Sequence, residues 1–275
     1  MSSRPTRGAK MSWVPTEAER ARPGPGAFLA QPWPLWRPLW ARGDRLDGWL
    51  FHLGSLALMH LISGGGYMLV SRISAARGVT VWDPVLPLDR AVPALGWTIF
   101  PYVSYYLYGV LTILVTPRTP VGRQRLLVLY QGLVAMSLVV FAFFLLLPSE
   151  IHLVRDLPSE LLEGVGLVPG LFRWLHWLDR PWNAWPSHHA CVSLVIALFV
   201  SRSVASPLAR AVMWVAWALL ALSILTTKQH FVFDLVTGVA LGWATWRLVV
   251  CIPLEAADGH PYPPGSEPAP PLQGG

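Results

Sequence analysis

The chain has 275 residues, of which 53% are hydrophobic and only 13% are charged. A soluble globular protein usually has about a quarter of its residues charged, so this composition excludes a soluble protein and indicates a membrane protein. The formal net charge is +6. We expect these basic residues to face the membrane surface, with no nucleic acid as a partner.

The first 47 residues form a basic tail that is rich in proline and tryptophan. They contain no early apolar core of the kind that marks a signal peptide. Within the tail, segment 32–40 alternates tryptophan with proline and contains Arg37. This pattern indicates either a segment that lies along the membrane surface or a disordered tail with some apolar residues.

Six apolar runs follow, each near the length of about 20 residues that spans a hydrocarbon core. They cover 48–70, 94–115, 126–148, 189–204, 208–226 and 229–251. The sequence therefore predicts an all-α, polytopic integral membrane protein with six transmembrane helices in a domain over 48–251. The Pro/Gly-rich end, 252–275, is expected to be disordered.

The distribution of basic residues predicts the orientation of this domain. With six spans, 14 of the 21 Lys and Arg residues fall on the side of the N-terminal tail. The positive-inside tendency then places both termini in the cytoplasm. We expect the protein in the cell (inner) membrane, with the loops before the fourth and sixth runs together on the extracytoplasmic face.

Those two loops carry the ionisable residues that are hardest to explain by packing. His230 and Asp234 stand four residues apart at the start of the sixth run, so a helix stacks them on one face. The carboxylate can hold the imidazole in one tautomer and leave its other nitrogen free to attack. A satisfied polar pair between helices is the structural alternative. The stretch 186–189, Pro-Ser-His-His, opens the fourth run on the same face, so the two motifs are expected to form one active site.

These motifs resemble the signatures of the type 2 phosphatidic acid phosphatase superfamily. Pro-Ser-His-His at 186–189 is similar to its second signature, Pro-Ser-Gly-His, and His230-x3-Asp234 is similar to its third. The lead-in at 183–185, the following Ala190 and the stretch 227–230 resemble the branch that includes inositol phosphorylceramide synthases. The resemblance covers the motifs and the six-helix layout of 48–251.

The resemblance implies a role for each matched residue. His230 would be the nucleophile that forms a phosphohistidine, with Asp234 as its orienting partner. His189 would be the general acid that protonates the leaving oxygen, and Ser187 would donate a hydrogen bond to a phosphate oxygen. His188 is expected to be a neighbour of these groups and not a catalyst. The chemistry implied needs no metal and no other cofactor.

The cationic part of the resemblance is less complete. Arg173-x6-Arg180-Pro181 has the spacing of the first signature, Lys-x6-Arg-Pro, with Arg in place of Lys, and it lies unusually close to the second signature. The third signature has an Arg six residues before its histidine, where this chain has Ile224. Lys228 is the candidate that supplies the missing charge. Arg180, Lys228 and Arg173 are therefore expected to bind the substrate phosphate.

These features together predict an integral membrane phosphatase that hydrolyses a lipid-linked phosphate or pyrophosphate. An inositol phosphorylceramide synthase-like phosphotransferase, which moves a phospho-head group to or from a polyol, is one alternative, and a non-enzymatic lipid transporter is another. A zinc hydrolase could use His188, His189, His230 and Asp234, but the chain has no compact metal-ligand motif. Segment 161–178 is expected to form an interfacial lid or simple surface packing.

Overall fold

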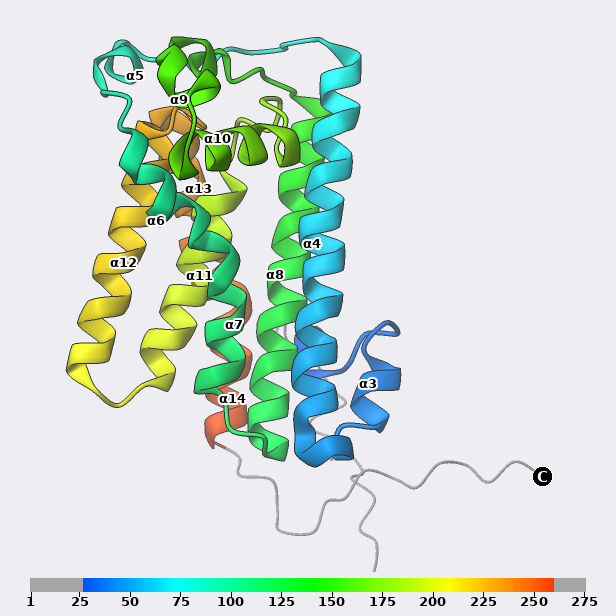
Figure 1. Ribbon diagram of the computed structural model, residues 1–275. Helices are drawn as coiled ribbons and strands as arrows, with labels where there is room; N and C mark the ends of the chain where they lie inside the picture. Colours follow the sequence, from blue (N-terminus) through cyan, green and yellow to red (C-terminus); the bar gives the residue numbers. More distant parts are fainter. Residues whose placement is uncertain (1–26, 260–275) are drawn as a thin grey trace, which may run out of the picture.

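The computed structural model describes residues 27–259, which form a bundle of long helices with short helices at both ends (Figure 1). The α-helices are α2 (Ala27–Ala30), α3 (Arg37–Ala41), α4 (Trp49–Arg77), α5 (Pro87–Ala91), α6 (Ile99–Val103), α7 (Tyr105–Val115), α8 (Pro120–Leu146), α9 (Ser159–Glu163), α10 (Leu167–Leu178), α11 (His188–Ser203), α12 (Pro207–Thr226), α13 (Val232–Thr245) and α14 (Cys251–Gly259). Short 3-10 turns precede α4 and α6 and follow the bridge at Ser149, and a π-turn, Trp246–Val250, joins α13 to α14.

Five helical stretches are long and apolar enough to cross a membrane. They are Arg45–Arg77, Gly96–Val115, Pro120–Leu146, Pro207–Thr226 and Val232–Glu255. The shorter apolar helix α11, with 16 residues, packs against α7, α8, α12 and α13 and completes the bundle. The predicted all-α, polytopic membrane fold is confirmed.

Local sequence signals set several of the helix ends. α8 begins with Pro120 directly after Thr119, whose hydroxyl accepts a hydrogen bond from the amide of Gly122 at 3.1 Å. α12 begins in the same way, with Ser206 before Pro207. These are the residue types that satisfy or remove the free amides of a first helical turn. The second predicted run contains a short break at Ser104, between the end of α6 at Val103 and the start of α7 at Tyr105, although the stretch Gly96–Val115 is still long enough to span.

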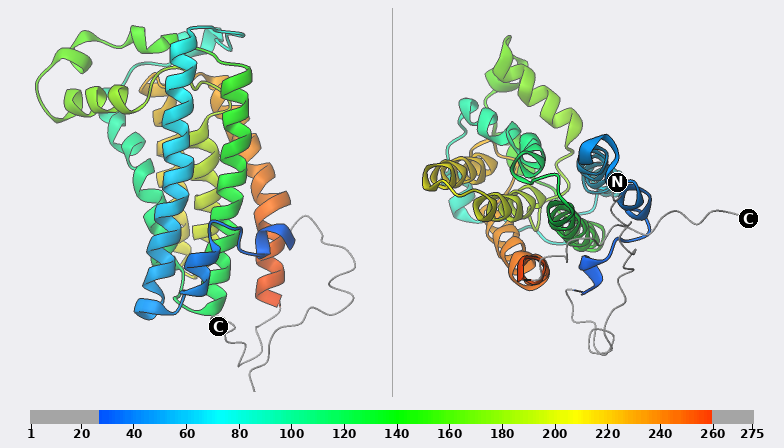
Figure 2. Two further views of the ribbon diagram at one scale, coloured as in Figure 1. Left: turned by 90° about the vertical axis from the view of Figure 1, so that its right-hand side faces the viewer. Right: turned by 90° about the horizontal axis from the view of Figure 1, so that it is seen from below.

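The alternating direction of the long helices places both histidine motifs at one end. α11 and α13 each begin at the end that carries α5, α9 and α10, whereas α3 and α14 lie at the other end (Figure 1). The first of these ends is called the motif end below. α10 lies across the long helices, as the side views in Figure 1 and in the left panel of Figure 2 show. Its Phe172 and Leu175 are buried, while Leu167, Trp174 and Trp177 are exposed.

The end of the N-terminal tail is docked on the bundle. Trp36 is fully buried, and Gln131, inside α8, accepts a hydrogen bond from the amide of Trp33 at 2.6 Å. The side-chain amide of Gln131 donates to the carbonyl oxygens of Leu29 and Gln31, at 2.9 and 3.0 Å. The disordered-tail alternative is therefore wrong for this segment, because a buried α8 side chain holds its main chain. Residues 1–26 lie outside the described part.

Replacing Gln131 by leucine should lower the free energy of unfolding by about 3 kcal/mol or more, at about 1 kcal/mol or more for each of three hydrogen bonds lost. Leucine has a similar size, but it leaves the amide of Trp33 and two carbonyls without partners, and each such group costs about 1–3 kcal/mol. Thermal unfolding in detergent measures the loss. Gln31→Leu is the matched control, because its side chain is exposed. Equal melting temperatures for the two variants would contradict the docking role of Gln131.

The other end of the chain also departs from the sequence expectation. The predicted disordered tail began at residue 252, but α14 continues to Gly259, with Leu254 buried against the bundle. Leu254 packs in the hydrophobic core, and the π-turn before α14 lets the chain continue as a helix past Cys251. The rest of the predicted tail, 260–275, lies outside the described residues.

Candidate active site

The start of α11 places the first histidine motif. The Ser187 hydroxyl accepts a hydrogen bond from the amide of Ala190 at 3.3 Å, which caps the helix. His188 and His189 are therefore the first two residues of the helix, where main-chain amides have no partner in the preceding turn. Both imidazoles are buried. The helix thus carries His189 directly at its positive end.

The start of α13 fixes the orientation of His230. Asp234 Oδ2 accepts hydrogen bonds from the Phe231 amide at 2.9 Å and from His230 Nδ1 at 3.2 Å. His230 Nδ1 also lies 2.9 Å from the carbonyl oxygen of Ala184. Because a carbonyl only accepts, Nδ1 carries a proton. In the neutral ring Nε2 then has a free lone pair, and this buried atom has no hydrogen-bond partner among the described residues.

Two glycines in α13 bring the motifs together. A Cβ at Gly238 would lie 2.6 Å from the carbonyl oxygen of Ser187, and one at Gly242 would lie 2.9 Å from that of Cys191. α13 therefore packs directly against the main chain of α11, as small residues four apart allow in membrane helices. The amide of Ser187 also donates to the carbonyl of Asp234 at 3.0 Å. As a result the rings of His189 and His230 lie 5.8 Å apart, centre to centre.

Aromatic side chains from three other helices surround His189. The ring of Tyr67 in α4 lies 5.5 Å from the His189 ring, that of Tyr102 in α6 at 5.2 Å and that of Tyr105 in α7 at 4.6 Å. The Tyr102 hydroxyl lies 3.5 Å from His189 Nε2, while the buried Nδ1 has no partner among the described residues. The two neighbouring rings of His189 and His230 thus each have one buried nitrogen without a partner among the described residues, an arrangement that costs stability and is typical of functional sites.

Comparison with known families agrees with this geometry. The family model described as the PAP2 superfamily matches residues 133–257. Residues 133–257 belong to the PAP2 superfamily. The match begins inside α8 and ends inside α14, so it contains both histidine motifs. A search of curated proteins and a search of solved structures each returned no significant match.

The predicted superfamily is therefore confirmed. PAP2 membership supports a phosphatase or phosphotransferase function in general, and the apolar helices indicate an integral membrane protein. A phosphatase-like protein embedded in the membrane implies a lipid substrate. The match does not distinguish the inositol phosphorylceramide synthase-like branch from the others.

The three cationic residues that are expected to bind the substrate phosphate make different contacts in this PAP2 region. Lys228 donates to the carbonyl oxygens of Asp89 at 2.9 Å and Val92 at 2.6 Å, so its ammonium anchors α5. Arg173 donates to the carbonyls of Leu162 and Gly164, both at 2.9 Å, and closes the turn between α9 and α10. Main-chain oxygens thus take part of the hydrogen-bond donors of these two side chains, and their binding of phosphate stays a prediction.

Arg180 is the remaining cation of the three. Its main chain is held by Ser71, whose hydroxyl donates to the Arg180 carbonyl at 3.1 Å, and its side chain is exposed at the motif end. A planar guanidinium there can bind two phosphate oxygens at once.

Two polar residues of the site were missed by sequence reasoning. Asp179 is buried and accepts a hydrogen bond from the Tyr67 hydroxyl at 2.8 Å. Burial raises the pKa of the Asp179 carboxyl to about 6, against the opposing effects of the Tyr67 hydrogen bond and of positive charge on His230. Asp179 directly precedes Arg180, which is the one sequence signal that marks it. Tyr67 lies within an apolar run and has no comparable signal.

The first histidine of the Pro-Ser-His-His motif, His188, makes its hydrogen bond away from the pair of His189 and His230. His188 Nε2 lies 2.9 Å from the Ser137 hydroxyl in α8, and its ring stacks on Tyr67 at 5.2 Å.

Within residues 27–259, no three His, Cys, Asp or Glu side chains are grouped so that they could hold a metal ion.

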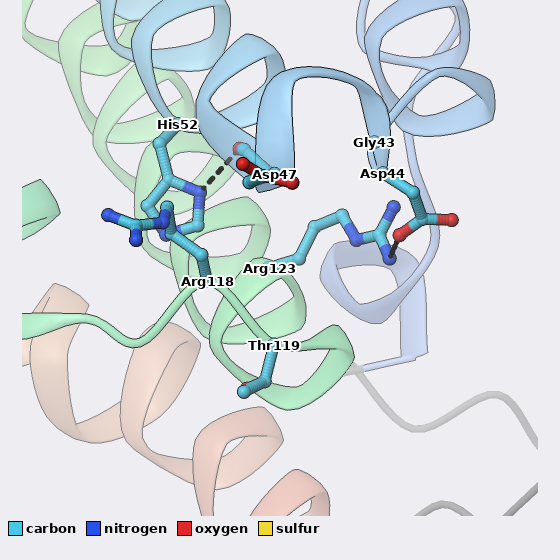
Figure 3. Close-up of a pocket in the computed structure, with 8 residues that line it drawn as sticks. Gly43, Asp44, Asp47, His52, Arg118, Thr119 and Arg123 are labelled. Atoms are coloured by element: carbon cyan, nitrogen blue, oxygen red, sulfur yellow. Dashed lines mark hydrogen bonds and ion pairs between the residues drawn. The ribbon is translucent and has the colours of Figure 1, made fainter.

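A separate polar pocket lies at the opposite end of the bundle (Figure 3). Its two arginines are already engaged, since Arg123 forms an ion pair of 2.6 Å with Asp44, and the Arg118 guanidinium lies 4.4 Å from the ring centre of Trp49. These contacts tie α8 and the loop before it to α4 and the chain that precedes it.

Proposed function

We propose that the protein is an integral membrane phosphatase that hydrolyses a lipid-linked phosphate or pyrophosphate through a phosphohistidine on His230. The observation that carries the proposal is the unpartnered Nε2 of His230, which is fixed by Asp234 and lies beside His189. Such a step needs a nucleophile, a carboxylate that orients it, and a second ionisable group within hydrogen-bond range of the reacting atom.

In the first step, His230 Nε2 attacks phosphorus and the bond to the leaving oxygen breaks. His189 donates a proton to that oxygen, because a bare alkoxide or phosphate is a poor leaving group. A positioned general acid contributes about 10²–10⁴-fold to such a step. Asp234 keeps the proton of His230 on Nδ1 and stabilises the positive charge that develops on the ring.

The phosphate is held by the start of α11 and by Arg180. The Ser187 oxygen already accepts from the Ala190 amide, so its O–H is left to donate to a phosphate oxygen. The amides of the first turn of a helix favour an anion at the same place. Arg180 adds a charge from the exposed side of the motif end.

The substrate test uses detergent-purified protein and a panel of lipid phosphates and pyrophosphates, each with and without inositol. We expect release of inorganic phosphate that vanadate inhibits. A new inositol-dependent lipid with little free phosphate would instead establish the phosphotransferase. The resemblance of stretches 183–190 and 227–230 to the inositol phosphorylceramide synthase branch favours this alternative. Lipid movement across vesicles without any chemical change would establish a transporter and refute the proposal.

The orientation proposed for this site follows from the basic residues, which gather on the side of the termini. Val165→Cys, at a fully exposed position between α9 and α10, should react with a membrane-impermeant maleimide in intact cells. Leu208→Cys, exposed at the opposite end, is the control and should react only after the membrane is opened. The two native cysteines are buried and give a low background. The reverse pattern would place the site in the cytoplasm.

A further inference from the structure

Asp179 is a buried carboxyl group that the chemistry above does not use. It follows the last residue of α10, and the residue is buried, with 8% of its surface exposed. Oδ2 accepts from the Tyr67 hydroxyl, while the buried Oδ1 has no hydrogen-bond partner among the described residues. A buried carboxyl oxygen without a partner costs stability, so a ligand that satisfies it is expected.

The carboxyl group belongs to the surroundings of the histidine pair. Tyr67, which donates to Asp179, also presents its ring to both His188 and His189. Positive charge on His230 lowers the pKa of Asp179, so the two groups interact electrostatically. Asp179 is thus linked to the histidine pair through Tyr67 and through its electrostatic interaction with His230. The three groups come from the end of α10, from α11 and from the turn before α13.

The chemistry of a free carboxylate oxygen selects its ligand. It accepts hydrogen bonds and carries negative charge, so it repels the oxygens of a phosphate and attracts an O–H group. Once the phosphohistidine has formed, O–H groups are present on the protonated leaving group and on the acceptor that removes the phosphate. Only the acceptor must give up its proton in the next step, so the acceptor is the O–H group that needs a base. Phosphate and acceptor would then be held on different sides, the phosphate by Ser187 and Arg180 and the acceptor by Asp179.

We propose that Asp179 binds the hydroxyl of the acceptor, water or an alcohol, and takes its proton in the second step. This role rests on the proposed function. The acceptor oxygen forms a bond to phosphorus, the bond from phosphorus to His230 Nε2 breaks, and its electron pair returns to Nε2. The acceptor proton moves to Asp179 Oδ1 and then to His189, which gave up a proton to the leaving group, so the cycle closes.

The pKa of Asp179 suits this role, because a general base works best when its pKa is near the working pH. The titratable groups that act on it are the His230 ring and the hydroxyls of Tyr67, Tyr102, Tyr105 and Tyr106. The base form is needed, so the rate of dephosphorylation should fall as pH drops through about 6. Tyr67→Phe removes the hydrogen bond that lowers this pKa and should move the fall to higher pH.

The test follows the phosphohistidine itself. Full-length wild type and Asp179→Asn are mixed with ³²P-labelled phosphatidic acid and, in parallel, with terminally labelled polyprenyl pyrophosphate, and acid-quenched protein is counted over time. We expect Asp179→Asn to label about as fast as wild type but to lose the label about 10²-fold more slowly, within the usual range for a general base. Asp156→Asn, an exposed acid at the same end, is the control and should match wild type.

The outcomes separate this role from the proposed function. No label on wild type with a lipid that it hydrolyses would overturn the phosphohistidine and the role of Asp179 with it. If wild type takes up the label, and a folded Asp179→Asn variant loses it as fast as wild type does, that result would overturn only the role of Asp179. So would an Asp179→Asn variant that takes up no label, because a base for the second step is not needed in the first. An unchanged pH profile in Tyr67→Phe would also count against the role.

Discussion

Replacing His230 by alanine should reduce turnover of the lipid substrate by about 10⁴-fold or more, the scale on which loss of a catalytic nucleophile acts. The variant has no atom that can form the bond to phosphorus, and water must then attack directly. Phosphate release by the purified variant, with vanadate-treated wild type as the blank, measures the loss. The fold should persist, because the hydrogen bond of Asp234 to the Phe231 amide, which caps α13, remains.

His152→Ala is the matched control for this variant. It makes the same substitution at the same end of the molecule, where His152 pairs with Asp83 at 3.1 Å and takes no part in the histidine pair. Its turnover should stay within a few-fold of wild type. Turnover above background in a folded His230→Ala variant would refute the nucleophile.

His189→Ala separates the acid from the nucleophile. It should lose lipid turnover by about 10²–10⁴-fold, the usual contribution of a general acid. With p-nitrophenyl phosphate, whose leaving group needs no proton, most of this loss should disappear, whereas His230→Ala should stay inactive. Equal losses with both substrates would assign His189 to another role.

Replacing Gly238 by alanine should damage both stability and activity. The added methyl group would lie 2.6 Å from the carbonyl oxygen of Ser187 and 3.1 Å from the Cβ of Ala190, so α11 and α13 must move apart. Overpacking of this kind costs about 1–3 kcal/mol of unfolding free energy. Because the same contact sets the spacing of the two histidines, a shift of about 1 Å can also lower the rate by about 10²-fold. Thermal unfolding in detergent and phosphate release measure the two effects.

Gly64→Ala in α4 provides the comparison. No atom lies within 4 Å of a Cβ built at Gly64, and alanine is the better helix former by about 1 kcal/mol. This variant should be as stable as wild type or more so, with normal turnover. If Gly238→Ala behaved in the same way, the direct contact of α13 with the start of α11 would not set the site.

The features that sequence predicts here are those with a local pattern. Apolar runs near spanning length mark the helices, and the alternating direction of six spans puts both motifs at one end. The four-residue spacing of His230 and Asp234 predicts their hydrogen bond. The helix start is less accurate, since α13 begins at Val232 and not at Gln229, because the Asp234 side chain caps it there.

The features that sequence missed depend on contacts between distant positions. Tyr67 and Asp179 are 112 residues apart, and no sequence pattern around either residue predicts their contact. Lys228 has the charge expected of a phosphate ligand, but its side chain extends to α5. Charge and spacing predict that a residue can bind phosphate, whereas the direction of a long side chain depends on which carbonyls the fold places within its reach.

The docked N-terminal segment has a consequence for how the chain is assembled. The amide that holds Leu29 belongs to Gln131, which is 102 residues later in the chain and is made well after it. The hydrogen bonds of Gln131 to the carbonyls of Leu29 and Gln31 can form only after α8 has been synthesised. Docking of this early segment therefore depends on a helix that is made about a hundred residues later, so the two parts of the chain must meet after α8 is in place.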